Sequence, residues 1–198
     1  DTVAAIVNHP DINKVAFTGS TGVGKIIQKA IAGTAKKATL ELGGKSANII
    51  FDDAPLDQAI EGIVNGIFFN QGHVCCAGSR LFVQENIADK VVHKLKHRMK
   101  SLVVGNPLDK NTDVGAINSK EQLQIIKKYI KIGKDEGAEV LTGGNVITMN
   151  GLEKGYYIEP TVFKGNNKMR IFQEEIFGPV VSVTTFKDET EALEIAND

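Results

Sequence analysis

The sequence has little cysteine, no long hydrophobic run and no excess of charge of either sign. Only 2 of its 198 residues are cysteine, and 23 Lys and Arg stand against 24 Asp and Glu. A chain so balanced offers neither a basic surface that collects nucleic acid nor an acidic solvating tail. No apolar stretch approaches the roughly 20 residues that a membrane-spanning helix requires. We therefore expect a soluble globular protein with no nucleic-acid or membrane partner.

The two cysteines, Cys75 and Cys76, are adjacent. A disulfide between neighbouring residues would be strained, so we expect free thiols in a reducing compartment. This favours a cytoplasmic location, and the same thiols would also suit an organelle reached through an upstream targeting segment.

The ends of the chain predict a longer protein. There is no initiator Met, an apolar helical pattern begins at Val3, and a helix that opens near Asp188 stops at Asp198. We expect further sequence beyond both ends.

Strand and helix patterns alternate along almost the whole chain. Strand patterns cover residues 15–17, 38–42, 47–51, 81–83, 140–141, 156–158, 161–163 and 180–186. Helical spacing of apolar residues covers 3–7, 25–31, 55–67, 87–102 and 123–130, the last stopped by Gly133 or Gly137. Alternation of this kind predicts an α/β fold with open, mostly parallel sheets and flanking helices. The length allows one domain or two small ones.

A glycine-rich stretch follows the first strand pattern. Gly19 to Lys25 fits GxxxxGK, the front of a phosphate-binding P-loop at a helix N-terminus. The next residue is Ile26, where a P-loop needs Ser or Thr for magnesium. The glycines also read GxxGxG and not the GxGxxG of the common dinucleotide fingerprint. The position favours a turn that binds a nucleotide phosphate, with a plain tight turn and a P-loop module as the alternatives.

The stretch from Phe68 to Arg80 holds both cysteines between a helix and a strand pattern. Buried cysteine is usually an inert small hydrophobe. Here neighbouring glycines permit close backbone approach, and the amides that follow the helix could stabilise a thiolate or an oxyanion. Glu41 lies between two leucines at a strand end, where burying a carboxylate is costly without a purpose. A thiol nucleophile with a carboxylate base is an intelligible pair.

Metal and serine-hydrolase chemistry have weaker signals. His93 and His97 are four residues apart on a helical pattern, the spacing of a ligand pair. The lysines between and around them, at 90, 94, 96 and 100, predict a solvated basic face and no metal site. No GxSxG elbow is present to suggest a nucleophilic serine.

Four motifs in this sequence resemble one family, the NAD(P)-dependent aldehyde dehydrogenases. They are FTGST at residues 17–21 followed by Gly24, LELGGKS at 40–46, the FFNQG to CAGSR block at 68–80, and EEIFGPV at 174–180. Their order and intervals are similar to those of the family, and the resemblance covers nearly the whole chain. It implies that the chain is the middle of such an enzyme, with residues 1–43 ending a Rossmann-like dinucleotide-binding domain and residues 44–198 beginning the catalytic domain.

The resemblance also implies roles for individual residues. Cys75, three residues before the glycine of AGSR, would be the nucleophile, beside Cys76 at a variable position. Glu41 would be the general base for deacylation. The implied cofactor-binding residues are Gly19, Ser20, Gly24, Leu42, Glu175 and Phe177, the last two at the nicotinamide ribose and ring, and Phe69 would line the substrate tunnel.

The resemblance implies an enzyme that oxidises a small-molecule aldehyde with NAD or NADP, through a thiohemiacetal and a thioester on the cysteine. It also implies that the intact enzyme is a homo-oligomer. A CoA-acylating semialdehyde dehydrogenase is the near alternative, and Glu41 favours the hydrolytic branch. A fragment inactive in isolation is another, because the family's oxyanion-hole asparagine and adenosine-ribose lysine would lie upstream, and the remaining substrate funnel downstream.

Two positions depart from the family pattern. His73 stands where glutamine is common, and Gly22 where glutamate is common. An imidazole near the thiol could titrate near neutrality and shift its pH dependence.

Overall fold

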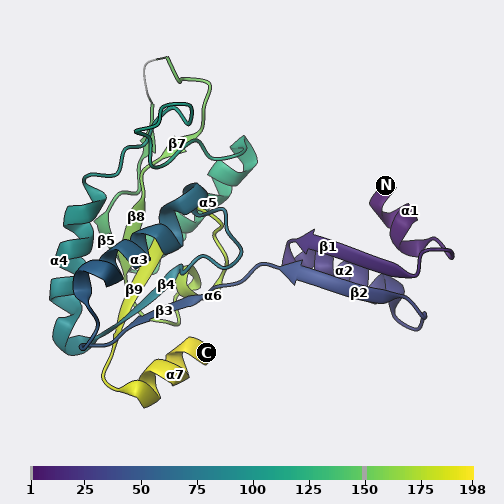
Figure 1. Cartoon of the computed structure of the whole chain (residues 1–198), viewed down its shortest axis with the longest axis horizontal. Helices are drawn as coiled ribbons and strands as arrows, with labels where there is room; N and C mark the ends of the chain where they lie inside the picture. Colours follow the sequence, from purple (N-terminus) through teal and green to yellow (C-terminus); the bar gives the residue numbers. More distant parts are fainter. Residues whose placement is uncertain (1, 149–150) are drawn as a thin grey trace. The chain divides into compact units, whose positions relative to one another are not determined.

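The computed structural model describes residues 2–148 and 151–198. The chain forms two compact units, residues 1–44 and 45–198 (Figure 1). The assignment of a cofactor-binding role to the first and a catalytic role to the second stays a prediction. None of the helices in the described residues combines the length and the apolar character needed to cross a membrane.

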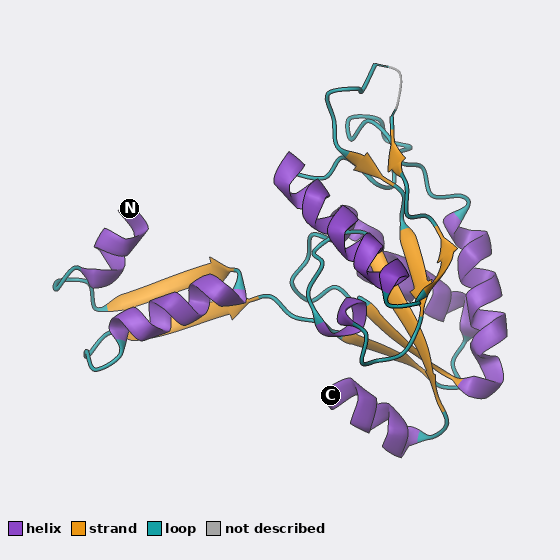
Figure 2. Ribbon diagram, turned by 180° about the vertical axis from the view of Figure 1, so that it is seen from behind, coloured by secondary structure: helices purple, strands orange, loops and turns teal. Residues whose placement is uncertain are grey.

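The first unit is a small βα layer. It contains α1 (Thr2–Asn8), β1 (Lys14–Gly19), α2 (Thr21–Ile31) and β2 (Lys37–Leu42). The two strands are parallel, with Gly19 opposite Leu42 at the end of the ladder. Helix α2 lies against this pair of strands (Figures 1 and 2). The core of the first unit consists of Val7, Val15, Ile27 and Ile31.

Helix α2 begins at Thr21, four residues earlier than the sequence pattern indicates. Ser20 is the reason, because its side chain caps the helix by accepting a 3.3 Å hydrogen bond from the Val23 amide. Gly24 therefore lies inside the helix and not in a loop, and Ser20 alone separates β1 from α2. The GxxxxGK reading as a P-loop is wrong on geometry as well as on chemistry.

The buried face of α2 also differs from the expected one. Ile26 is 66% exposed, whereas Ile27 and Ile31 are buried. Ala30 is exposed, and Gly24 takes its place on the inner face. Helical periodicity explains this, because positions 24, 27 and 31 share a face that position 26 does not.

The second unit is built on a five-stranded sheet in the order β3-β4-β9-β8-β5 (Figures 1 and 2). Its strands are β3 (Ala47–Ile50), β4 (Arg80–Gln84), β5 (Glu139–Thr142), β8 (Thr161–Lys164) and β9 (Val180–Phe186). All neighbours are parallel except β5 and β8, which are antiparallel. The predicted α/β fold with mostly parallel sheets is confirmed.

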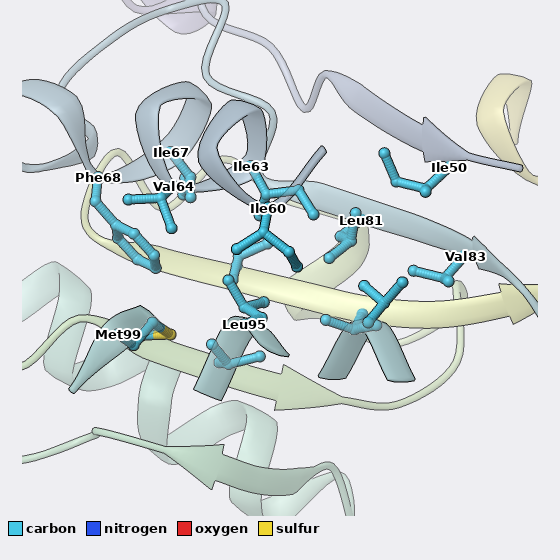
Figure 3. Packing of buried hydrophobic residues seen from close by; sticks show 14 of the residues in the cluster. Ile50, Ile60, Ile63, Val64, Ile67, Phe68, Leu81, Val83, Leu95 and Met99 are labelled. Atoms are coloured by element: carbon cyan, nitrogen blue, oxygen red, sulfur yellow. The ribbon is translucent and has the colours of Figure 1, made fainter. Parts of the chain in front are cut away.

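Helices cover both faces of this sheet. Side chains alternate along each strand, so Leu81 and Val83 of β4 pack with α3 (Leu56–Phe68) and α4 (Ala88–Met99). Phe82 points to the other face, which α5 (Lys120–Asp135), α6 (Arg170–Gln173) and α7 (Glu189–Asn197) cover. Figure 3 shows the first layer, where Ile60, Ile63, Val64, Ile67 and Phe68 of α3 lie near Leu81, Leu95 and Met99.

Several short elements have no clear periodic signal. They are the 3₁₀ turns at Phe69–Gly72 and Glu85–Ile87, strand β6 (Val146–Ile147) and α6. Strand β6 pairs antiparallel with β7 (Tyr157–Ile158), which lies within the predicted strand at residues 156–158. Of the two glycines expected to stop α5, Gly137 does so in a left-handed conformation, with φ of 87°. Gly133 lies inside the helix. A Cβ there would meet Ile171 at 3.1 Å, so the glycine permits close packing at this position.

Candidate active site

Residues 69–79, here called the thiol loop, connect α3 to β4. The loop opens with three consecutive residues in the left-handed region, Asn70 (φ 50°), Gln71 (φ 56°) and Gly72 (φ 72°). Left-handed backbone costs a residue with a side chain about 1–2 kcal/mol. Glycine is required at position 72 for two reasons. Its φ is positive, and a Cβ there would lie 2.2 Å from the Gly178 carbonyl oxygen.

Hydrogen bonds hold this strained turn in place. The Gln71 side chain donates to the Ala116 carbonyl at 3.1 Å and accepts from the Gly115 amide at 3.4 Å. Asn70 and His73 are linked twice, by the His73 amide to the Asn70 carbonyl and by the Asn70 side chain to the His73 carbonyl. The surrounding structure thus fixes a conformation that the residues would not adopt alone.

Both thiols lie in the exposed turn that follows. Cys75 and Cys76 are free and exposed. The amides of residues 77, 78, 79 and 80 donate to the carbonyls of Val74, Gly66, Ala77 and Ser46 respectively. The amides of Cys75 and Cys76 make no hydrogen bond among the described residues. These two amides, next to the thiols themselves, are therefore candidates for the predicted oxyanion donors.

The thiol loop packs against a second loop, residues 174–179. Phe177 in this loop has φ of 55°, an outlier for a bulky residue. Its ring is stacked on that of His73, with centroids 5.5 Å apart and planes within 3° of parallel. Next to this contact, the backbones of Gly72 and Gly178 touch. The two loops meet at two adjacent points.

A side chain from α5 fixes the backbone of the 174–179 loop. Gln122 donates to the carbonyls of Ile176 and Phe177, both at 2.9 Å. Ser119 caps α5 by accepting from the Gln122 amide, which sets the position of this residue. Sequence reasoning missed Gln122, since a polar residue in a first helical turn gives no sign of a distant loop.

Glu174 anchors the start of the same loop. Arg170 donates two hydrogen bonds to its carboxylate, at 2.7 and 2.9 Å, and the Tyr129 hydroxyl donates a third at 2.6 Å. The bonds from Arg170 and then Tyr129 lower the pKa of Glu174 to about 2. Burial, with the bond to Glu174, raises the pKa of Tyr129 to about 12. Glu175, the predicted ribose contact, follows this anchor and is partly buried.

His73 is enclosed more than its sequence position suggested. Its Nε2 is buried and has no hydrogen-bond partner among the described residues. Burial lowers the pKa of His73 below its ordinary 6.5. The protein interior disfavours the charged form of this imidazole and moves its pKa to the acid side of the ordinary value. The expected effect of His73 on the pH dependence of the thiol stays a prediction.

Lys45 carries a buried amine in the same unit. Its Nζ is enclosed without a hydrogen-bond partner in the described part of the chain, although the residue as a whole is only partly buried. Burial lowers its pKa to about 7, the Arg80 charge adds to this, and Glu175 opposes it. Nothing in the sequence pointed to this amine beyond its place in a motif.

Phe68 and Phe69 have opposite environments. Phe68 is 2% exposed in the core beneath the sheet's covering helices, whereas Phe69 is 70% exposed. An exposed aromatic at the start of the thiol loop is available to an apolar ligand, as its predicted place in a substrate tunnel requires.

In the first unit, Glu41 is exposed on β2, and its neighbours Leu40 and Leu42 are partly buried. The expectation that this carboxylate is buried is wrong for this unit, since alternation along the strand turns it away from the leucines.

The predicted glycines of the first unit have packing explanations. A Cβ on Gly24 would lie 2.6 Å from the Leu42 side chain, so the glycine permits close packing of α2 on β2. A Cβ on Gly19 would lie 2.5 Å from the ring of Phe17. Gly22 has nothing within 4 Å of its position and leaves open space at the start of α2.

His93 and His97 are exposed on α4. The described residues contain no group of three or more His, Cys, Asp or Glu side chains placed to hold a metal ion.

Comparison with known proteins gives consistent matches over the whole chain. The chain is 52% identical over 199 residues to an aldehyde dehydrogenase from Deinococcus radiodurans, a match that covers 98% of this chain and 38% of that protein. It superposes with a TM-score of 0.97 on a point mutant of betaine aldehyde dehydrogenase from Staphylococcus aureus, solved with NAD+ and a BME-modified cysteine, at 41% identity. HpcC from Thermus thermophilus gives a TM-score of 0.96 at 44% identity.

The two structural matches cover 100% of this chain and 40% and 39% of the solved chains. The chain thus spans about two fifths of the length of these relatives. Residues 1–198 match the aldehyde dehydrogenase family. On the motifs, the fold and this match, the chain belongs to the aldehyde dehydrogenase family.

Proposed function

We propose that the whole protein oxidises an aldehyde to a carboxylic acid with a nicotinamide cofactor, NAD or NADP, and that Cys75 is its nucleophile. The observation that carries this is the exposed Cys75 thiol on a strained loop, packed against a second loop that also has a strained residue. Among the described residues, every non-glycine residue with positive φ lies in these two loops. Backbone strain held by its surroundings is typical of active sites.

The relatives support both parts of this proposal. A Staphylococcus aureus betaine aldehyde dehydrogenase binds NAD+ and carries a cysteine modified by BME, so a reactive thiol occurs in a protein with this fold. That protein's substrate is not transferred to this chain, because nothing in the two loops specifies one aldehyde.

Cys75 begins the reaction by covalent attack. Its thiolate adds to the aldehyde carbon, a C–S bond forms, and the carbonyl oxygen becomes the oxyanion of a thiohemiacetal. The amides of Cys75 and Cys76 are available to donate to that oxygen. When the oxyanion restores its C=O bond, hydride leaves the carbon and a thioester remains on Cys75. The bound nicotinamide supplies the acceptor for that hydride.

Glu41 completes the cycle in this proposal. Water attacks the thioester carbon while the Glu41 carboxylate takes a proton from it, and the C–S bond breaks to give the acid and the thiolate. The side chain is exposed, so water can reach it. General-base assistance of this kind is typically worth about 10²- to 10⁴-fold.

In this proposal the cofactor's phosphates bind at the start of α2 in the first unit. The first turn of α2, residues 21–23, is exposed, and Gly22 leaves space for an anion to approach the backbone amides. Ser20 and Gly19 form the turn that presents this helix end, and Gly24 and Leu42 pack it on β2. These residues fit an anionic group.

Two residues of the second unit are the proposed contacts of the nicotinamide. Glu175 and Phe177 would contact the nicotinamide ribose and ring, on a backbone that Gln122 keeps in place. Phe69, exposed at the start of the thiol loop, would contact the apolar part of the aldehyde.

The test uses the full-length protein, a panel of aldehydes and both cofactors, with reduced nicotinamide followed by absorbance. We expect Cys75→Ala to lower turnover by at least about 10³-fold, because the covalent route is lost. Cys76→Ala is the matched control and should stay within about 3-fold of the wild type. Full activity in Cys75→Ala would overturn the proposal.

We also propose a cytoplasmic homo-oligomer that acts on small molecules. Cell fractionation tests the location. Size-exclusion chromatography with light scattering tests the assembly, and a monomer at working concentration would contradict it.

A further inference from the structure

The contact between His73 and Phe177 joins the two loops of the candidate site. His73 lies two residues before the thiol of Cys75, and Phe177 lies two residues after the carboxylate of Glu175. The rings are 5.5 Å apart and within 3° of parallel. A movement of one loop would therefore change the packing of the other, because the two rings are in contact.

The environment of His73 suits it to stacking and not to proton transfer. Its Nε2 is enclosed and has no hydrogen-bond partner among the described residues. Burial also lowers the pKa of the ring, so the neutral form, which stacks without a desolvated charge, is favoured. A polar nitrogen buried without a partner is unfavourable. The position keeps a ring despite this cost.

The conformation of Phe177 needs support from outside its own chain segment. Its φ of 55° is an outlier for a bulky residue, and Gln122 holds the backbone on one side. The ring of His73 holds the side chain, and the Gly72 to Gly178 backbone contact lies next to it. Without the ring at position 73, the side chain of Phe177 loses its flat support.

We propose that His73 is a positioning residue that presents Phe177 to the cofactor and couples cofactor binding to the thiol loop. This rests on the proposed function, in which Phe177 contacts the nicotinamide ring. A glutamine at this position would have no ring with which to stack. His73 therefore gives this chain a loop-to-loop contact that a glutamine there would not make.

The test is a double-mutant cycle in the full-length protein, with NAD+ and NADP+ binding measured by isothermal titration calorimetry. The variants are His73→Leu, Phe177→Leu and the double variant, with His73→Phe as the change that keeps a ring and removes both nitrogens. His73→Gln is a second loss variant. Thermal melts by circular dichroism confirm that each protein is folded.

We expect His73→Leu and His73→Gln to weaken cofactor binding by about 3- to 10-fold, the range of measured aromatic pair energies. Their kcat at saturating cofactor and aldehyde should stay within about 3-fold of the wild type, while KM for the cofactor rises. His73→Phe should bind within about 2-fold of the wild type. The double variant should bind no more weakly than Phe177→Leu alone, because one contact is lost only once.

Two results would overturn the inference while the proposed function stands: additive effects in the cycle, or a loss in His73→Phe as large as in His73→Leu. If the wild-type protein binds neither nucleotide, the proposed function and this inference fall together.

Discussion

The chain makes two bends at positions where the sequence predicts function, and it makes them by different means. Between β1 and α2, Ser20 has ordinary extended angles, φ of −67° and ψ of 146°, and caps the following helix with its side chain. In the thiol loop, Asn70, Gln71 and Gly72 are all left-handed, and other segments must hold them there. The first bend is local and relaxed. The second is strained and depends on distant residues.

The glycines show the same difference. Gly24 is needed because α2 packs closely on Leu42, and a flexible leucine side chain is what a larger residue would meet. Gly72 is needed for its φ of 72° and because the carbonyl of Gly178 lies where a Cβ would be. Substitution should therefore be tolerated better at Gly24, in the helix that follows the first bend, than at Gly72 in the second bend.

The largest expected effect is that of Gly72→Ala. A Cβ 2.2 Å from a backbone oxygen forces the two loops apart, and we expect a loss of about 2–4 kcal/mol in the unfolding free energy. Urea unfolding followed by circular dichroism measures it. The control is Gly62→Ala in α3, where nothing lies within 4 Å and a gain of up to about 1 kcal/mol is expected. Equal unfolding free energies for Gly72→Ala and Gly62→Ala would contradict the requirement for glycine at position 72.

The next effect concerns Lys45, a buried amine near the strained loops. Its folded pKa of about 7 is below the ordinary 10.5, so between these pH values the unfolded chain binds more protons. The unfolding free energy contributed by this group therefore rises as pH increases from about 7 towards 10.5, and the penalty is full below pH 7.

Replacing Lys45 by Met removes that penalty. We expect Lys45→Met to exceed the wild type in unfolding free energy by on the order of 2 kcal/mol at pH 7, and by less as the pH rises. Urea unfolding at pH 6, 7, 8 and 9 measures the difference. Lys90→Met, at an exposed position of α4, is the control and should show no such narrowing. If the difference in unfolding free energy between Lys45→Met and the wild type stayed constant across the pH series, the buried charge of Lys45 would not be its cause.

The smallest effect is in helix α2, directly after the relaxed bend. Gly24→Ala meets only the side chain of Leu42, which can shift, so we expect a loss of about 1–2 kcal/mol. Gly22→Ala, two residues earlier in the same helix, has open space and should gain up to about 1 kcal/mol. Thermal melts followed by circular dichroism compare the stabilities of the two variants. A larger loss at Gly24 than at Gly72 would reverse the ranking of the bends.

The sequence predicts regular elements well where they are long. The helix over Ile60, Ile63 and Ile67 follows from the spacing of one buried face. The strand at residues 180–186 follows from a short apolar run that is buried on both faces of the sheet. Spacing misplaces the start of α2 because a serine cap outweighs the poor helix propensity of glycine. The short α6 and the 3₁₀ turns have too few residues to show a period.

The candidate site is predicted in part. The motif identifies Cys75 as the candidate nucleophile, and the exposure of its thiol agrees with that role, which stays a prediction. The roles of Glu41 and of the cofactor residues stay predictions. Gln122, the His73 to Phe177 stack and the buried amine of Lys45 could not be found from the sequence, because each depends on contacts between segments tens of residues apart.

The central place of β9 has a consequence for synthesis of the protein. This strand lies between β4 and β8, so the sheet beside the thiol loop is incomplete until residues 180–186 have been made. Those residues follow Cys75 by roughly a hundred positions, which is on the order of 10 s at ordinary translation rates. During that interval the thiol loop adjoins a sheet that lacks its central strand, and the loop conformation that depends on the 174–179 segment cannot form.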